Sequence, residues 1–298
     1  MRTIFSKFKR SVRLFLGKHY PKLLVSILYR IAFGKRIDWD DPRTLNEKIH
    51  WLKFNTDTSL WTLLADKYRV REYVRQRGCE DLLVNLYGVW TDSSEIDWDS
   101  LPDKFVMKSN CSSGDVRICT DKSKIDRQEW EAHFDKAMRD KLGYERGEPH
   151  YNAIEPAVIA EELLDISKQP IRTSSLIDYK IWCFNGKIFG TWVCYNRKGM
   201  SADTEWHDLD WRFRPEWSVF TDHYRNGKGV IPKPNSYEEM LQVASKLSTG
   251  FPQVRIDLYN IDGKIYFGEM TFTSAGGHNN FYSDEALNLM GDLTILPQ

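Results

Sequence analysis

The fold is decided by two stretches, Val254-Arg255-Ile256-Asp257-Leu258-Tyr259 and Ile265-Tyr266-Phe267-Gly268-Glu269-Met270-Thr271. Apolar and polar residues alternate along both, as they do in half-buried strands. Asp262-Gly263, a strong turn signal, lies between them. The two stretches therefore predict a β-hairpin that carries two carboxylates.

The length of the hairpin loop decides whether those carboxylates can cooperate. A two-residue loop, Asp262-Gly263, would place Asp257 and Glu269 on opposite faces, because the side-chain period of a strand is two. A three-residue loop from Ile261 to Gly263 would make them diagonal neighbours on one face, and we predict this loop. Paired carboxylates suit Mg²⁺, which prefers hard oxygen ligands. The alternative is two solvated charges on a half-exposed sheet.

Two further strand ends carry candidate binding residues. Lys108 ends the predicted strand 104–109 and precedes a loop of small residues, so an ammonium and backbone N–H groups could surround a phosphate. The GxxxxGK[ST] pattern of a P-loop is missing, and a lysine such as Lys108, taken alone, is more often an edge-strand charge. The predicted strand 157–164 ends in Glu161 and Glu162, which could accept ribose hydroxyls beside a base or remain solvated.

The remaining pattern predicts an α/β chain. A capping box at Thr44 and Glu47 begins one helix, and Asn185-Gly186 predicts a second hairpin. Residues 143–152 read as a flexible loop, and 197–229 show little periodicity. The other helices are expected over 4–15, 23–31, 66–77, 126–141, 236–247 and 284–290. A strand or a buried connection is expected over 82–90, and a short strand over 116–120.

Charge is distributed unevenly along the 298 residues. The chain has 42 basic and 42 acidic residues, yet residues 1–37 hold ten basic residues and no acidic one. The remaining 32 basic and 42 acidic residues argue against a general nucleic-acid binder. Five cysteines without a CxxC pair predict a reducing, cytoplasmic compartment. No segment approaches the roughly 20 apolar residues that a membrane span needs.

Taken in order, these segments resemble the ATP-grasp superfamily, in particular its TupA-like branch, associated with teichuronopeptide and other surface-polysaccharide synthesis. The resemblance extends from about Leu45 to Phe272. It rests on six segments in this order and spacing: Leu45-Asn46-Glu47-Lys48-Ile49, Leu64-Ala65-Asp66-Lys67-Tyr68, Pro102 to Lys108, Ala160-Glu161-Glu162-Leu163, Asp178-Tyr179-Lys180 with Phe184-Asn185-Gly186-Lys187, and the hairpin from Arg255 to Thr271.

The resemblance implies an ATP-grasp fold of the α/β (α+β) class. Two lobes with antiparallel or mixed sheets would hold ATP between them, after a helical N-terminal region. The expected segments are a basic amphipathic appendage (1–37), a helical part of the core (38–81), a central lobe with the phosphate loop (82–152), and a C-terminal lobe with the hinge and metal site (153–298).

The resemblance also assigns residue roles. The expected catalytic residues are Lys108, Lys180 and Arg255. The expected magnesium ligands are Asp257, Glu269 and Thr271, where Thr271 stands in place of an asparagine common in the family. The expected ATP contacts are Lys67, Lys108, Ser112, Ser113, Gly114, Glu161, Glu162, Leu164 and Lys180.

The implied activity joins a carboxylate to an amine through an acyl phosphate, with ATP and two Mg²⁺ ions. The substrates would be an amine or amino acid and a sugar acid such as a uronic acid. Residues 273–278 could bind the acceptor through backbone N–H groups. Arg255 could hold an anionic substrate or form a structural ion pair, and His207 and His223 could line a sugar site.

Two other functions remain open at this stage. A metal-dependent glycosyltransferase would use a DxD motif, which Asp208-Leu209-Asp210 matches, but Asp38-Trp39-Asp40 and Asp97-Trp98-Asp99 match equally well. The basic residues 1–37 could instead make the protein a membrane-associated scaffold, or add peripheral contact with the inner face of the membrane to a cytoplasmic enzyme. Packing of these helices on the core is the alternative.

Overall fold

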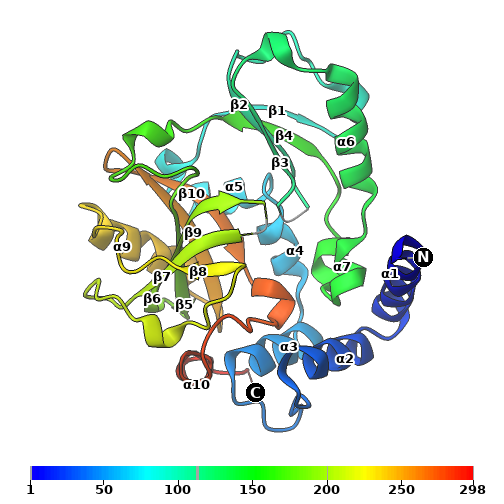
Figure 1. Cartoon of the computed structure of the whole chain (residues 1–298), viewed down its shortest axis with the longest axis vertical. Helices are drawn as coiled ribbons and strands as arrows, with labels where there is room; N and C mark the ends of the chain where they lie inside the picture. Colours follow the sequence, from blue (N-terminus) through cyan, green and yellow to red (C-terminus); the bar gives the residue numbers. More distant parts are fainter. Residues whose placement is uncertain (1, 112–113, 200, 298) are drawn as a thin grey trace. The chain divides into compact units, whose positions relative to one another are not determined.

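A computed structural model describes residues 2–111, 114–199 and 201–297, with side chains from residue 9 onward (Figure 1). The chain divides into two compact units. The first unit contains the residues up to Leu24 together with Thr58–Arg75 and Leu83–Leu164. The second unit contains Val25–Asp57, Gln76–Leu82 and the residues from Asp165 onward.

The first unit is built on a four-stranded antiparallel sheet with the order β1-β4-β2-β3. Its strands are β1 (Leu86–Trp90), β2 (Phe105–Ser109), β3 (Val116–Cys119) and β4 (Val158–Glu162). β4 follows the others after a long helical excursion, yet it pairs with both β1 and β2. This pairing brings the two predicted nucleotide-binding strands, β2 and β4, side by side.

One helix covers one face of this sheet. α6 (Arg127–Arg139) begins at Asp126, whose carboxylate accepts the N–H of Glu129. Its residues Trp130, Phe134 and Met138, spaced one turn apart, pack on the inward side chains of β2 and β4. Lys108 on β2 and Glu161 on β4 therefore lie on the opposite face of the sheet.

Further helices complete the first unit, and two predictions made from the sequence are wrong there. The helix predicted over 66–77 begins only at Val70, because the Asp66 carboxylate accepts the N–H groups of Tyr68 and Arg69 and forms a turn. The predicted flexible loop 143–152 is helical. The helices here are α1 (Arg2–His19), α4 (Ser59–Ala65), α5 (Val70–Gln76), α7 (Leu142–Arg146) and α8 (Pro149–Asn152).

The second unit is built on a six-stranded sheet with the order β10-β9-β5-β6-β7-β8, antiparallel except for β7 and β8. The predicted Asn185-Gly186 hairpin is confirmed, and both turn residues have positive φ. The strands are β5 (Asp178–Phe184), β6 (Lys187–Lys198), β7 (Ser201–His207), β8 (Tyr224–Asn226), β9 (Val254–Ile261) and β10 (Lys264–Thr271).

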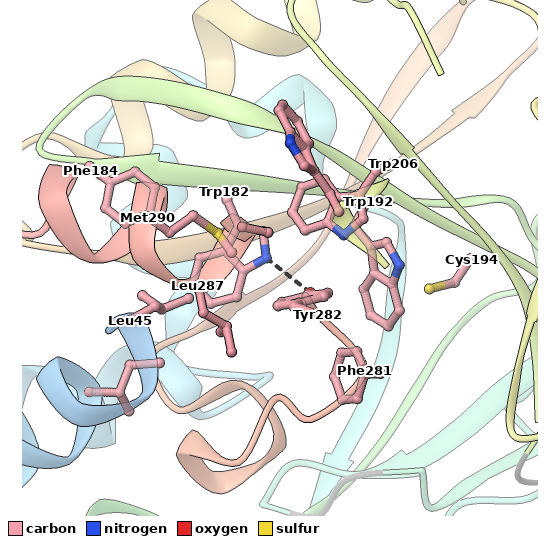
Figure 2. Packing of buried hydrophobic residues seen from close by; sticks show 13 residues of the cluster. Leu45, Trp182, Phe184, Trp192, Cys194, Trp206, Phe281, Tyr282, Leu287 and Met290 are labelled. Atoms are coloured by element: carbon pink, nitrogen blue, oxygen red, sulfur yellow. Dashed lines mark hydrogen bonds between the residues drawn. The ribbon is translucent and has the colours of Figure 1, made fainter. Parts of the chain in front are cut away.

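Helices cover both faces of this sheet. α9 (Tyr237–Ser248) packs on one face, where its Tyr237 hydroxyl lies 3.0 Å from that of Thr191. An aromatic cluster fills part of the other face against α3 (Leu45–Asn55) and α10 (Asp284–Leu293) (Figure 2). There, Trp182 donates its indole N–H to the Tyr282 hydroxyl at 3.1 Å. The predicted capping box at Thr44 is confirmed at the start of α3.

The remaining elements are the helix α2 (Pro21–Phe33) and six 3₁₀ turns of the described residues. α2 is the second of the two N-terminal helices expected from the sequence. None of the described helices is long and apolar enough to cross a membrane. The 3₁₀ turns are Glu80–Leu82, Ser93–Glu95, Lys122–Lys124, Ile166–Lys168, Pro215–Trp217 and Ser274–Gly277.

Candidate functional site

The β9–β10 hairpin has a two-residue loop, so the predicted three-residue loop is wrong. Lys264 pairs with Ile261, and Asp262 and Gly263 both have positive φ, as a tight hairpin turn requires. This register alone would separate the two carboxylates. It shifts by one residue after Phe267, however, so that Glu269 lies directly opposite Asp257. The expectation that both carboxylates share a face is therefore confirmed, by a β-bulge instead of by the turn.

Gly268 is the extra residue of this bulge. A Cβ atom at this position would lie 2.9 Å from the carbonyl oxygen of Asp257 and 3.2 Å from the Tyr259 ring. Because real Cβ contacts are longer, only glycine lets β10 approach β9 here without displacing backbone. The bulge thus positions the carboxylate pair, and the glycine permits the bulge.

Gly268→Ala should therefore damage both stability and the site. We expect the free energy of unfolding to fall by about 1–3 kcal/mol, the usual cost of overpacking, and ATP turnover to fall with it. Urea denaturation and ADP release measure the two effects. Gly263→Ala is the comparator, since it strains the turn without crowding Asp257. Equal turnover in the parent and Gly268→Ala would contradict this role for the bulge.

Arg255 joins the residues of this carboxylate pair. Its guanidinium donates to both oxygens of Asp257, at 2.7 and 2.8 Å, and to Glu269 at 3.2 Å. It also donates to the hydroxyls of Thr271 at 3.1 Å and Ser274 at 2.8 Å. The structural ion pair, one of the two roles considered for Arg255, is thus present.

Lys180 completes the cluster from the neighbouring strand. Its backbone pairs with Asp257, and its ammonium forms ion pairs with Asp257 and, at 2.6 Å, with Asp178. Burial lowers the pKa of Lys180, as does Arg255, but Asp178, Asp257 and Glu269 outweigh both and raise its pKa above the ordinary value. Lys180 is therefore a fixed positive charge, not a proton donor near neutral pH.

Asp178 was not among the predicted site residues. It lies two residues before Lys180 on the same face, where Arg197 also contacts it at 3.0 Å. Its position in Asp178-Tyr179-Lys180 was the available signal, because residues i and i+2 of a strand share a face. Asp178 holds Lys180 independently of Asp257.

The residue types of the cluster fit a magnesium ion. Asp257, Glu269 and Thr271 offer hard oxygen atoms on one face, and the Glu269 side chain is 38% exposed. The three carboxylates of the cluster are balanced by Lys180, Arg197 and Arg255. Among the described residues, no group of three or more His, Cys, Asp or Glu side chains is already arranged to hold a metal. The remaining positions around an Mg²⁺ ion held here would be filled by water or by phosphate oxygens.

The turn after β10 has unusual backbone geometry. Ala275, Gly276 and Gly277 have φ values of 48°, 69° and 87°. A Cβ atom at Gly277 would lie 2.6 Å from the ring of His50, which is buried on α3. His278 follows, with its ring centroid 4.8 Å from that of His50. The turn predicted to bind an acceptor thus ends in one histidine, His278, and packs against another, His50.

These histidines predict loss of stability in acid. Burial, followed by the charge of Lys53, lowers the pKa of His278 from 6.5 to about 4, and burial also lowers that of His50. Between about pH 4 and pH 6.5, His278 binds a proton in the unfolded chain but not in the folded chain. Stability should therefore be intact above about pH 6.5 and fall towards pH 4, by at most ~3 kcal/mol for His278.

Urea denaturation at several pH values measures this slope. His278→Gln should make the slope shallower, whereas His223→Gln, which alters a half-exposed ring against Tyr224, should leave it unchanged. An unchanged slope in His278→Gln would contradict the assignment.

The first unit presents Lys108 on the sheet face opposite α6. The Lys108 ammonium forms an ion pair with Glu161, which is buried and also accepts from Arg71 at 3.2 Å. Val116 and Ile118 on β3 share this face and are 47% and 60% exposed. The result is an open apolar surface with a cation beside it. Arg71 was missed, because only the fold brings α5 to β4.

The loop after β2 is anchored at its first residue. The Asn110 side chain accepts the N–H of Ala157 at 2.8 Å and donates to the Glu155 carbonyl at 3.0 Å. Its own carbonyl accepts the N–H of Lys67, so Lys67 lies beside the loop. Gly114 ends the loop with φ 78° and open space around it. Ser112 and Ser113 lie outside the described residues.

The segment from Glu161 to Leu164, which the family resemblance makes the hinge that recognises adenine and ribose, has residues in different surroundings. Glu161 is enclosed by Lys108 and Arg71, whereas Glu162 accepts from the Asn85 side chain at 2.8 Å. Leu164 is buried. The Glu161 side chain is therefore engaged with cations and is not turned toward solvent.

The other sequence candidates have structural partners. His207 is 2% exposed, lies 2.9 Å from Glu205, and stacks on Trp211. Asp208 accepts the N–H groups of Asp210 and Arg212, which makes the DxD match a turn. His223 packs on Tyr224. His207 is thus closed to a sugar, and Asp208 is committed to backbone groups.

Comparison with known proteins places the chain in a family. The sequence model described as TupA-like ATPgrasp matches residues 47–295. The chain belongs to this ATP-grasp family, which confirms the family and the two-sheet α/β fold expected from the sequence. Membership supports an ATP-dependent ligase, and ATP-grasp ligases generally use ATP and Mg²⁺. No curated protein sequence matches the chain.

Solved structures similar to this chain include three ligases. The D-alanine–D-alanine ligase of Bacillus anthracis is 16% identical, with 78% of this chain and 67% of that chain covered and a TM-score of 0.43. The D-alanine–D-alanine ligase of Helicobacter pylori is 14% identical, with 78% of this chain and 62% of that chain covered and a TM-score of 0.43. An L-amino acid ligase from Bacillus licheniformis is 16% identical, with 85% of this chain and 56% of that chain covered and a TM-score of 0.45. The chain thus spans between 56% and 67% of the length of these three proteins.

Proposed function

We propose that the protein is an ATP- and Mg²⁺-dependent carboxylate–amine ligase. The observation that carries the proposal is the pairing of Asp257 with Glu269 beside Lys180 and Arg255. Two facing carboxylates next to two buried cations suit a reaction in which metal-bound phosphate groups change their charge distribution. Family membership supports the same class of reaction.

The chemistry needs an activated carboxylate. A carboxylate oxygen attacks the γ-phosphorus of ATP and ADP leaves, which forms an acyl phosphate. An amine then attacks the acyl carbon, phosphate leaves, and the nitrogen loses a proton. Lys180 and Arg255 offset negative charge on the transferred group, so positioning and electrostatics suffice without an enzyme nucleophile.

Binding roles follow from the two sets of residues. Asp257 and Glu269, with Thr271 as a third oxygen, would hold Mg²⁺, which polarises the phosphates when bound. Lys108, Lys67 and the loop ending at Gly114 would contact phosphate oxygens, and the apolar face beside Lys108 would receive the base. The strained turn at 273–278 would bind the acceptor.

The substrates we propose are a sugar acid, such as a uronic acid of a surface-polysaccharide precursor, and an amine or amino acid. This choice rests on the TupA-like family alone. The reaction would take place in the cytoplasm, where ATP is available.

The test is ADP release from the full chain with ATP, Mg²⁺, a panel of uronic acids and a panel of amines. We expect ADP only when a carboxylate and an amine are both present. Glycosyl transfer from a nucleotide sugar in the absence of ATP would contradict the proposal and favour a glycosyltransferase.

Lys108→Met should weaken ATP binding by about 10- to 100-fold, because a hydrogen bond to a charged group contributes roughly 1.5–3 kcal/mol. The fold should survive, since Arg71 still pairs with Glu161. Calorimetric titration with ATP and Mg²⁺ measures the affinity. Lys124→Met, at a side chain that is 80% exposed, is the control. Equal affinity in the parent and Lys108→Met would remove Lys108 from the site.

A further inference from the structure

An apolar stripe runs along the exposed side of α2. Its members, Leu23, Ile27 and Ile31, are four residues apart and so lie on one side of the helix. Their exposed fractions are 51%, 41% and 75%.

The rest of α2 shows that this stripe is not the packing face. Leu24, Val25 and Tyr29 point the other way and are at most 1% exposed, with Val25 and Tyr29 in a buried cluster with Ile37. α2 is therefore apolar on two sides. One side is buried in the core, and the other faces solvent.

A cavity with two arginines opens beside the stripe. It has a volume of about 230 Å³, and its lining includes Ile27 and Arg30 from α2 together with Arg36 and Trp39 from the segment that follows. Guanidinium groups bind phosphate through paired N–H donors, and tryptophan favours the boundary between water and lipid. Apolar side chains beside this cavity match the acyl chains that adjoin a phospholipid phosphate.

The local charge has the sign that an anionic surface requires. Residues 25–37, which contribute most of the cavity lining, carry three basic residues, Arg30, Lys35 and Arg36, and no acidic one. Asp38 adjoins the cavity, but its carboxylate accepts the N–H groups of Asp40 and Asp41 in its own loop, at 3.1 and 2.9 Å. A second copy of the chain on a two-fold axis would set this basic segment against itself.

We propose that the stripe and the arginine cavity form a docking surface for an anionic phospholipid bilayer. α2 would lie in the plane of the interface, with Leu23, Ile27 and Ile31 at the acyl boundary and Arg30 and Arg36 at lipid phosphates. This contact is independent of the ligase reaction and needs no membrane-spanning helix.

Vesicle sedimentation of the full chain tests the proposal. We expect binding to vesicles of equal parts phosphatidylglycerol and phosphatidylcholine, at least tenfold weaker binding to phosphatidylcholine alone, and weaker binding at high salt. Ile31→Asp should reduce binding to the anionic vesicles at least tenfold. Ile295→Asp, at a side chain that is 73% exposed elsewhere, should bind like the parent.

The arginine cavity is tested separately. The double variant Arg30→Gln/Arg36→Gln should also bind at least tenfold more weakly, and Arg212→Gln, at a side chain that is 73% exposed, should not. All variants should keep the urea midpoint of the parent. The proposal is overturned if the parent does not bind anionic vesicles, or if Ile31→Asp binds them as tightly as the parent does. It is also overturned if light scattering shows a parent dimer that Ile31→Asp dissociates, because the stripe is then a contact between copies.

Discussion

Glu269→Gln is expected to reduce carboxylate- and amine-dependent ADP release by about 10²- to 10⁴-fold. The substitution keeps the size of the side chain but removes the charge that faces Asp257, and a metal-based contribution of several kcal/mol corresponds to this range. Stability should change by less than about 1 kcal/mol, because the side chain is 38% exposed and its contact with Arg255 is 3.2 Å long. The initial rate and the urea midpoint measure the two quantities.

Glu216→Gln is the matched control for this experiment. Its side chain is 45% exposed and pairs with Arg214, away from the hairpin. It should leave turnover unchanged. The concentration of Mg²⁺ that gives half-maximal turnover should rise in Glu269→Gln only. Full activity with an unchanged Mg²⁺ requirement in Glu269→Gln would refute the metal assignment.

Arg255→Gln is expected to lower the free energy of unfolding by about 3–5 kcal/mol. Its guanidinium is buried and contacts four side chains, two of them carboxylates. Removing one partner of a buried ion pair leaves a charge without compensation, which is costly. Urea denaturation measures the loss, and Arg255→Lys should recover only part of it because the ammonium cannot make the paired contacts.

Arg197→Gln is the control, because its side chain is 44% exposed and its ion pair in this cluster is with Asp178. Its cost should not exceed about 1 kcal/mol. If Arg255→Gln were as stable as the parent, the ion pair between Arg255 and Asp257 would not stabilise the fold. The other role considered for Arg255, binding of an anionic substrate, would then remain.

The sequence predicted the carboxylate pair on one face but for the wrong local reason. Alternation placed Asp257 and Glu269 on strands, and the turn signal placed the hairpin. The register depended on Gly268, since a glycine inside a strand pattern signals a bulge. Reading that signal would have replaced the three-residue loop with a tight turn followed by a bulge.

The sequence predicted Lys180 and Arg255 as site residues, but which side chains meet in the folded chain depends on distant pairing. Asp178 becomes a neighbour of Asp257 only when β5 pairs with β9, and Arg71 meets Glu161 only when α5 packs beside β4. Neither pairing follows from local periodicity.

Tertiary packing also overrode local pattern in two segments. β7 was missed because its buried residues include Thr204, Glu205 and His207, which break the apolar alternation. Backbone N–H groups and Tyr195 satisfy Glu205 there. The short helix α7 was read as a loop, yet its Tyr144 carbonyl lies against Gly17 of α1 so closely that no side chain fits at Gly17.

The most direct test of the ligase is the fate of the carboxylate oxygens. The sugar acid that supports ADP release is labelled with ¹⁸O in its carboxylate, and the phosphate produced is examined by ³¹P nuclear magnetic resonance. An acyl-phosphate route predicts that each phosphate released carries one ¹⁸O atom from the carboxylate, and that the amide keeps the other. Phosphate without the label would contradict the account, because ATP would then be hydrolysed by water without activating the acid.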